Sequence, residues 1–410
     1  MLEKLLNDRT LVPDQEPARP MEVVHKQRDC QVQTIFGVIT LRRRYYHHTK
    51  AGTGRFPLDH TLDLVRGHMP GIARLICRAS SMGDSYEGAA TDLHAYLGLA
   101  LESRNFGRLV ADILPELRAA QSSLPPPSLK EPIPILYAAS DGTGVPMRLA
   151  ELAGVKGRQP DGSARTREVK LGCIFTQTTT DEDGQPMRDP ASTTYVGTFE
   201  DCREAGTQLR AEALRRGYAT ARTTVYLGDG APWIWENARI NFPGSIQILD
   251  FYHASEHAGD LAKALLGPGP EAKAKQSQWC HTMKSKSSAP IIAQAKAVLS
   301  SRLHELSADQ VAAAQREIAY FTTNAKRTRY GEFRQKGYFI GSGVVEAGCK
   351  TVVGRRLKQS GMFWSKDGGD DLLTLRCLML GPSFLEVWNA RIPVLKASRA
   401  KPPKWSPSLN

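Results

Sequence analysis

The chain has 410 residues, 41% hydrophobic and 23% charged, which is enough for two or three domains and a sizeable core. Its 54 Lys and Arg against 42 Asp and Glu give a formal net charge of +12, which favours a polyanionic partner. Seven scattered cysteines without a C-x-x-C pair argue against a disulfide framework and a thiolate zinc site. No signal peptide and no apolar run of membrane-spanning length is recognised, so we expect a cytoplasmic protein with no membrane association.

Residues 1–59 are predicted to form an N-terminal arm with a β-hairpin. Stretches with alternating hydrophobicity lie on both sides of Gly37, as two strands joined by a tight turn require. Arg42, Arg43 and Arg44 extend the second stretch, next to two tyrosines. These arginines either contact DNA phosphates or belong to a solvated edge strand protected by charge.

Residues 60–121 are predicted to be helical, because their apolar positions recur at helical spacing. A short turn at Gly98 precedes a segment that carries Arg104 and Arg108. This is the outline of a helix-turn-helix that contacts DNA through both arginines, although packing in any small helical bundle produces the same pattern. A proline-rich linker is predicted over residues 122–134.

Five strands are predicted beyond the linker, in the order three strands, helix, strand, helix, strand. They cover residues 135–139, 167–175, 193–198, 223–227 and 245–249. This order is not the strict alternation of a doubly wound sheet.

A helical block is predicted over residues 260–336, where Ser307 and Gln310 are spaced as a capping box. A new helix is predicted to begin at Ser342 or Gly343. The last stretch, residues 393–410, is basic and predicted to be a disordered tail.

Three acids are the predicted catalytic residues. Asp141 ends the first predicted strand just before Gly142, Asp229 follows the fourth, and Glu346 lies on the helix after the helical block. Hard divalent cations such as Mg²⁺ bind carboxylate oxygens, and two such ions promote phosphodiester chemistry. An ordinary cap or turn role is the better interpretation of any one carboxylate. Three at strand or helix ends in this order favour a metal site.

Asp250 ends the fifth predicted strand and is the rival of Asp229 for the role of second acid. It could also orient the imidazole of His253, one helical turn later. The alternative is a structural pair that caps the next helix.

A basic segment follows Glu346. It comprises Lys350, Arg355, Arg356 and Lys358. These cations either clamp the DNA backbone beside the acids or form a solvated helix face.

Four phrases resemble insertion-sequence transposases of the ISKra type, distant relatives of the Mutator-like DDE enzymes. They are SDGTGVPM at 140–147, GDGAPWIW at 228–235, LDFYHASEH at 249–257 and GSGVVEAGCKTVVGRRLKQSGMFW at 341–364. The resemblance runs from about Arg42 to Arg376. It implies an α/β fold with a ribonuclease H-like mixed sheet flanked by helices, its core divided between 135–259 and 337–392 by the helical insertion.

The resemblance also implies a function. Such a protein is a nucleoid-associated bacterial enzyme that acts as a homo-oligomer on double-stranded DNA. It cuts element ends and joins them to target DNA with two Mg²⁺ or Mn²⁺ ions bound by Asp141, Asp229 and Glu346, while His253 lies near the scissile DNA. Relatives commonly carry a zinc-ribbon-like cysteine pair where this chain has His47 and His48, so no zinc is predicted. The alternatives are a catalytically inactive DNA-binding repressor or degenerate copy, and a structure-specific nuclease of the same fold.

Overall fold

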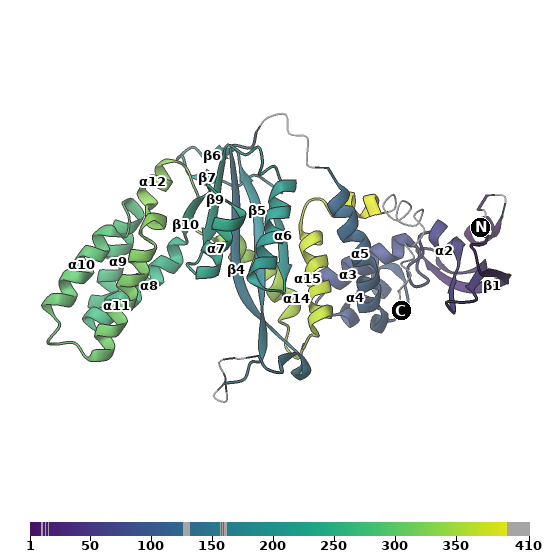
Figure 1. The fold of residues 1–410 in the computed structure, drawn as a ribbon, viewed down its shortest axis with the longest axis horizontal. Coiled ribbons are helices and arrows are strands. Elements are labelled where there is room, and N and C mark those ends of the chain that lie inside the picture. The colour runs from purple at the N-terminus through teal and green to yellow at the C-terminus, as the bar shows by residue number, and fades with distance from the viewer. Residues whose placement is uncertain are drawn as a thin grey trace, which may run out of the picture. The chain divides into compact units, whose positions relative to one another are not determined.

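The computed structural model describes residues 1–391 except 10, 13, 15, 126–131, 156, 158, 160 and 161. The chain divides into two compact units (Figure 1). Unit 1 comprises 1–124, 367–379 and 383–410, and unit 2 comprises 125–366 and 380–382. Part of the predicted linker and the whole predicted tail lie outside the described residues.

Unit 1 begins with the hairpin that was predicted around Gly37. Its strands are β1 (Glu22–Thr34), β2 (Gly37–His48) and β3 (Thr53–Arg55), all antiparallel. Gly37 has φ +108°, a backbone conformation that glycine adopts without strain. The hairpin packs its apolar side against α1 (Leu2–Asn7) and α2 (Pro57–Thr61), around buried Val32, Leu41 and Leu58.

The rest of unit 1 is helical. It contains α3 (Pro70–Met82), α4 (Tyr86–Leu97), α5 (Phe106–Ser123) and most of α15 (Lys366–Leu380). Leu375 and Trp388 belong to the same buried cluster as the apolar residues of α3, α4 and α5, and the buried Arg391 bonds Asp63 and Glu116. The end of the described chain therefore joins unit 1, which differs from the prediction that 337–392 completes the sheet-containing core.

Unit 2 contains a mixed five-stranded sheet with helices packed on it, which confirms the predicted α/β class. The strands are β4 (Ile135–Pro146), β5 (Thr166–Gln177), β8 (Thr194–Thr198), β9 (Thr223–Gly228) and β10 (Ile246–Leu249). Their order is β10-β9-β4-β5-β8. β4, β5 and β8 are antiparallel neighbours, whereas β9 and β10 run parallel to β4. β6 (Thr179–Thr180) and β7 (Pro186–Met187) form a separate pair.

Strand β4 is longer than its sequence predicted. Asp141 was expected to end it, because Gly142 and Gly144 follow, but pairing with β5 continues to Pro146. The glycines fit inside the strand because a Cβ on Gly142 would lie 2.4 Å from a Glu168 oxygen, and one on Gly144 2.9 Å from a Thr166 oxygen. Side chains of β5 fill the space, so these glycines mark close packing and not a strand end.

Opposite faces of the sheet carry different helices. A Cβ on Gly172 would meet Leu209 of α6 (Cys202–Arg215), whereas Leu171, the preceding residue of β5, contacts Gly348 of α13 (Gly343–Gly348). Successive strand residues point to opposite faces. Consequently, α6 covers one face, together with α7 (Pro232–Asn241), and α13 packs on the other.

A helical insertion separates β10 from α13, and it begins at Phe251, earlier than the predicted start at residue 260. Its helices are α8 (Phe251–Leu266), α9 (Pro270–Ser285), α10 (Ala289–Ser301), α11 (Ala308–Thr323) and α12 (Tyr330–Gln335), which lie beside the β10 edge of the sheet in Figure 1. The capping box of Ser307 and Gln310 is confirmed at the start of α11. The two ends of the insertion meet, because the Phe251 amide donates to the Ile340 carbonyl at 2.9 Å.

Candidate active site

Asp141 faces the helix that carries Glu346. It pairs with Leu171 across β4 and β5, and paired residues of neighbouring strands point to the same face. Since Leu171 contacts α13 through Gly348, the Asp141 side chain is on that face too. The Cys349 thiol, just beyond α13, donates a hydrogen bond to the Asp141 carboxylate.

The surroundings of Asp141 raise the pKa of its carboxyl group. Burial is the largest cause, and the carboxylates of Asp229 and Glu346 add to it. The Cys349 thiol and the Gly142 amide, which donates at 2.7 Å, act in the opposite direction. Two acids from distant segments are therefore close enough to act on Asp141 electrostatically.

Asp229 lies in the same row of the sheet as Asp141. Ala139 of β4 pairs with Leu227 of β9, so the parallel register, continued by two residues, brings Asp229 beside Asp141. The Asp229 carboxylate accepts a hydrogen bond from the Ala231 amide at 2.9 Å at the start of α7. One carboxylate oxygen thus fixes a turn, and among the described residues no cationic side chain forms an ion pair with Asp229.

Asp250 is fully buried and has a structural task. Its carboxylate caps α8 by accepting from the His253 backbone amide at 2.8 Å. It also accepts from the backbone amide of Ser342 and, at 2.9 Å, from the Ser342 hydroxyl. Of the two interpretations given for Asp250, its bonds favour the cap of the next helix, because the carboxylate contacts His253 through the backbone amide.

Ser342 links Asp250 to Glu346. Its hydroxyl oxygen is 2.9 Å from the Asp250 carboxylate and 2.9 Å from the Glu346 carboxylate. A hydroxyl has one proton to donate, so the two acids share it. Ser342 was predicted only as the cap of α13, where its side chain makes no capping bond, and its spacing of four residues from Glu346 was the signal that sequence reasoning missed.

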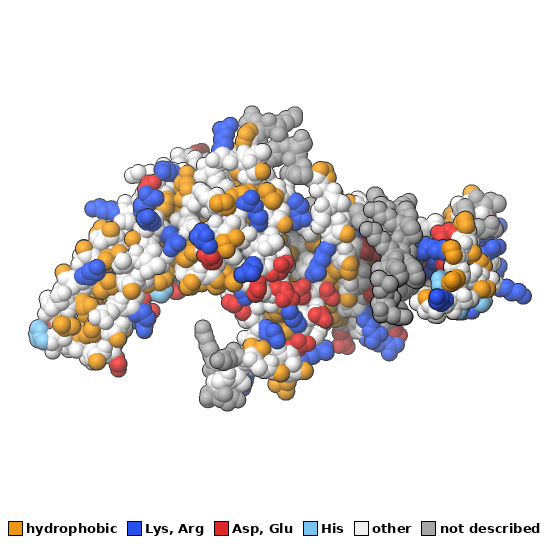
Figure 2. All heavy atoms as spheres, in the orientation of Figure 1, with side chains coloured by type: hydrophobic (Ala, Val, Ile, Leu, Met, Phe, Trp, Pro, Cys, Tyr) orange, Lys and Arg blue, Asp and Glu red, His pale blue; other side chains and the backbone are white. Residues whose placement is uncertain are grey.

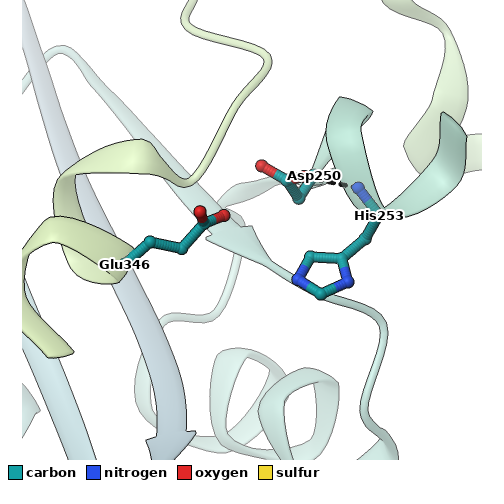
Figure 3. A group of neighbouring side chains, drawn as sticks. All are labelled: Asp250, His253 and Glu346. Carbon is teal, nitrogen blue, oxygen red and sulfur yellow. Dashed lines mark hydrogen bonds between the residues drawn. The ribbon is translucent and has the colours of Figure 1, made fainter. Parts of the chain in front are cut away.

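Three side chains offer ligand atoms that all lie within 4.8 Å of one another: Asp250, His253 and Glu346 (Figure 3). Asp141 and Asp229 are not in this group. The Asp250 carboxylate already accepts three hydrogen bonds, so a structural role explains why it lies near the other two side chains. Glu346 belongs both to this group and to the acids around Asp141. It lies beside His253, and its carboxylate also raises the pKa of Asp141.

The basic segment after Glu346 divides into exposed and buried cations. Lys350, Arg355 and Lys358 are exposed, and the Lys358 amine donates to the Thr143 hydroxyl on β4. Arg356 is only 1% exposed and lies over the Trp364 ring at 5.3 Å, so its role is packing.

The arginines of unit 1 divide in the same way. Arg42 is exposed, with 66% of its side chain accessible, and Arg44 is half-buried. Arg43 forms an ion pair with Asp59 and lies 3.8 Å from the Phe56 ring centroid. The two helical arginines, Arg104 and Arg108, are exposed, the former paired with Glu102 at 2.9 Å.

Replacing Arg43 by alanine is expected to lower the melting temperature of the protein, with a loss of about 2 kcal/mol, because its partly buried ion pair and ring contact both disappear. The matched variant Arg42→Ala should melt like the wild type, because its side chain is exposed. Differential scanning fluorimetry measures both melting temperatures. Equal stability of the two variants would contradict the structural role of Arg43.

Replacing Asp141 by asparagine is expected to raise the melting temperature of metal-free protein at pH 8, by roughly 1 kcal/mol of unfolding free energy. Its folded pKa is raised, so the ionised carboxylate lowers stability above that pKa, and the penalty vanishes as the pH falls toward the ordinary value. Thermal melts in chelator at pH 8 and pH 5 measure this, with exposed Asp183→Asn as control. A variant that melts below the wild type at pH 8 would show that the ionised Asp141 carboxylate does not destabilise the fold.

The fold and the site define a mixed α/β protein with an acidic cluster on one face of a five-stranded sheet. The chain belongs to UPF0236, an uncharacterised protein family, whose model matches residues 2–381. A comparison with curated proteins finds no match. Among solved structures, the Drosophila P element transposase strand transfer complex matches 75% of this chain and 78% of its own at 10% identity, with a TM-score of 0.29. A TM-score this low carries no weight for function. Within the described residues, no helix is long and apolar enough to cross a membrane.

Proposed function

We propose that this chain is a DDE transposase of an insertion sequence, of the ISKra type that its motifs resemble. The observation that carries the proposal is the approach of Asp229 and Glu346 to Asp141, from segments far apart in the chain, on one face of the sheet. The strand order, with three antiparallel strands followed by two parallel to the first, supports a ribonuclease H-like core.

The donor set suits Mg²⁺ or Mn²⁺. Asp141, Asp229 and Glu346 offer carboxylate oxygens, which are the ligands these hard cations take. Burial and, in addition, the nearby carboxylates of Asp229 and Glu346 raise the pKa of Asp141, and a bound cation would stabilise its ionised form. Two ions at such a site activate the attacking oxygen and stabilise the leaving oxygen of a phosphodiester.

Other side chains would serve the DNA. The His253 imidazole is 38% exposed beside Glu346, where it can exchange a proton with the reacting strand. Exposed Lys350, Arg355 and Lys358 would contact phosphates near the acids, and Arg42 and Arg108 would do so on unit 1. Lysine and arginine side chains are also dispersed over the helices of the insertion in Figure 2. Since an element has two ends, we propose that at least two copies act together.

A labelled element end incubated with protein and Mg²⁺ or Mn²⁺ tests the function. Hydrolysis should free a 3′-hydroxyl, and that hydroxyl should then join to an added target duplex. Cleavage without joining would favour the structure-specific nuclease, and binding without cleavage would favour the inactive repressor. If neither nicked nor joined DNA forms with either metal, the proposal fails.

A further inference from the structure

Tyr320 reaches from the helical insertion to the segment that carries Asp229. Its hydroxyl donates to the Asp229 backbone carbonyl at 3.1 Å. The next residue, Gly230, has φ +107°, and a Cβ there would lie 2.6 Å from the Tyr320 oxygen. The turn after β9 therefore needs a glycine both for its backbone conformation and for the approach of the tyrosine.

The Tyr320 ring is itself held in place. It stacks on the His257 imidazole, with ring centroids 3.6 Å apart and 20° between the planes. The Nδ1 atom of His257 is 2.6 Å from a carboxylate oxygen of Glu317, whose side chain is buried. Tyr320 and Glu317 lie on α11 and His257 on α8, so two helices of the insertion fix the position of one hydroxyl group.

Asp229 has few other restraints. It lies one residue beyond Gly228, the last residue of β9 that pairs with β10, and its side chain accepts from the Ala231 amide of the same turn. Asp250, at the end of the neighbouring strand, is instead held by three hydrogen bonds to its carboxylate. The hydrogen bond from Tyr320 therefore connects Asp229 to helix α11, outside the turn that contains Asp229.

We propose that Tyr320, supported by His257 and Glu317, is a positioning residue that aims the Asp229 carboxylate at Asp141. This proposal rests on the function given above, in which Asp229 binds a divalent cation. The insertion then takes part in building the active site, although it supplies none of its three acids. Partners that orient a metal ligand commonly change metal affinity when removed, even though they do not touch the ion.

The chain supplies a matched control. Tyr330, also from the insertion, donates its hydroxyl to the Leu249 carbonyl at 3.0 Å, one residue before Asp250. Tyr320→Phe and Tyr330→Phe thus each remove one hydroxyl bond to a backbone carbonyl beside a strand-end acid. Because three hydrogen bonds hold the Asp250 carboxylate in place, only Tyr320→Phe should affect cation binding.

Mn²⁺ titrations of the full chain by isothermal calorimetry test the proposal, with Asp229→Asn as the reference for a lost ligand. We expect Tyr320→Phe to weaken Mn²⁺ binding roughly 10-fold, and Tyr330→Phe to lower the melting temperature while binding Mn²⁺ like the wild type. Binding by Tyr320→Phe equal to the wild type, or equal weakening in both variants, overturns the positioning role. If the wild type binds no Mn²⁺, the proposed function itself fails, and the positioning role with it.

Discussion

Cleavage of a labelled element end is expected to fall roughly 1,000-fold in each of Asp141→Asn, Asp229→Asn and Glu346→Gln, which corresponds to about 4 kcal/mol of transition-state stabilisation. Each change removes one negative charge and one strong metal ligand while preserving the shape of the side chain. Single-turnover cleavage with Mg²⁺ measures the loss. Affinity for the end fragment should persist, because the cations proposed to contact phosphates are unchanged.

The control for these variants is Asp260→Asn, an exposed acid on α8 that pairs with Lys263 at 2.9 Å. It should cleave like the wild type. Wild-type rates in any of the three acid variants would remove that acid from the proposed active site.

Loss of stability, and not only of activity, is expected for Asp250→Ala. This change takes the acceptor from the backbone amides of His253 and Ser342 and removes the cap of α8, at a cost of about 3 kcal/mol, while the Ser342 hydroxyl keeps Glu346 as its acceptor. Thermal or urea unfolding measures it. The matched control is Asp201→Ala, which removes an exposed cap of α6 and should lower the stability much less.

Asp229 and Asp250 are thereby separated by opposite outcomes. Asp229→Asn should keep the melting temperature of the wild type and lose cleavage, whereas Asp250→Ala should unfold more easily. An Asp250 variant of undiminished stability that fails to cleave would make Asp250 the second catalytic acid in place of Asp229.

Strands β4, β9 and β10 could be predicted because each contains a short apolar run that leads to a carboxylate, namely Asp141, Asp229 and Asp250. The length of β4 could not, since the fit of Gly142 against Glu168 depends on which strand pairs with it and in which register. The burial of Asp250 could not be predicted from the sequence either. Its partner Ser342 is 92 residues away in the sequence, and only the return of the insertion brings them together.

Clusters of cations posed a similar difficulty. Arg42 and Arg43 are adjacent and chemically identical, yet one is exposed and the other pairs with Asp59. Arg356, within a basic segment, is buried beside Trp364. The pattern of residues along a strand or helix predicts which side a side chain faces, but not which residues it contacts on that side. The sequence alone therefore did not distinguish exposed arginines from buried ones.

The hydrogen bond between Phe251 and Ile340 joins the two ends of the insertion, so the insertion could be exchanged as a unit. A chain segment that leaves and returns at one point can grow, shrink or be replaced with little strain on its host, because closing a longer loop costs free energy only logarithmically in its length. Relatives could therefore carry insertions of different sizes on the same sheet. A different insertion would have to supply another hydroxyl group to the Asp229 carbonyl. Without one, the Asp229 carboxylate would be positioned less firmly.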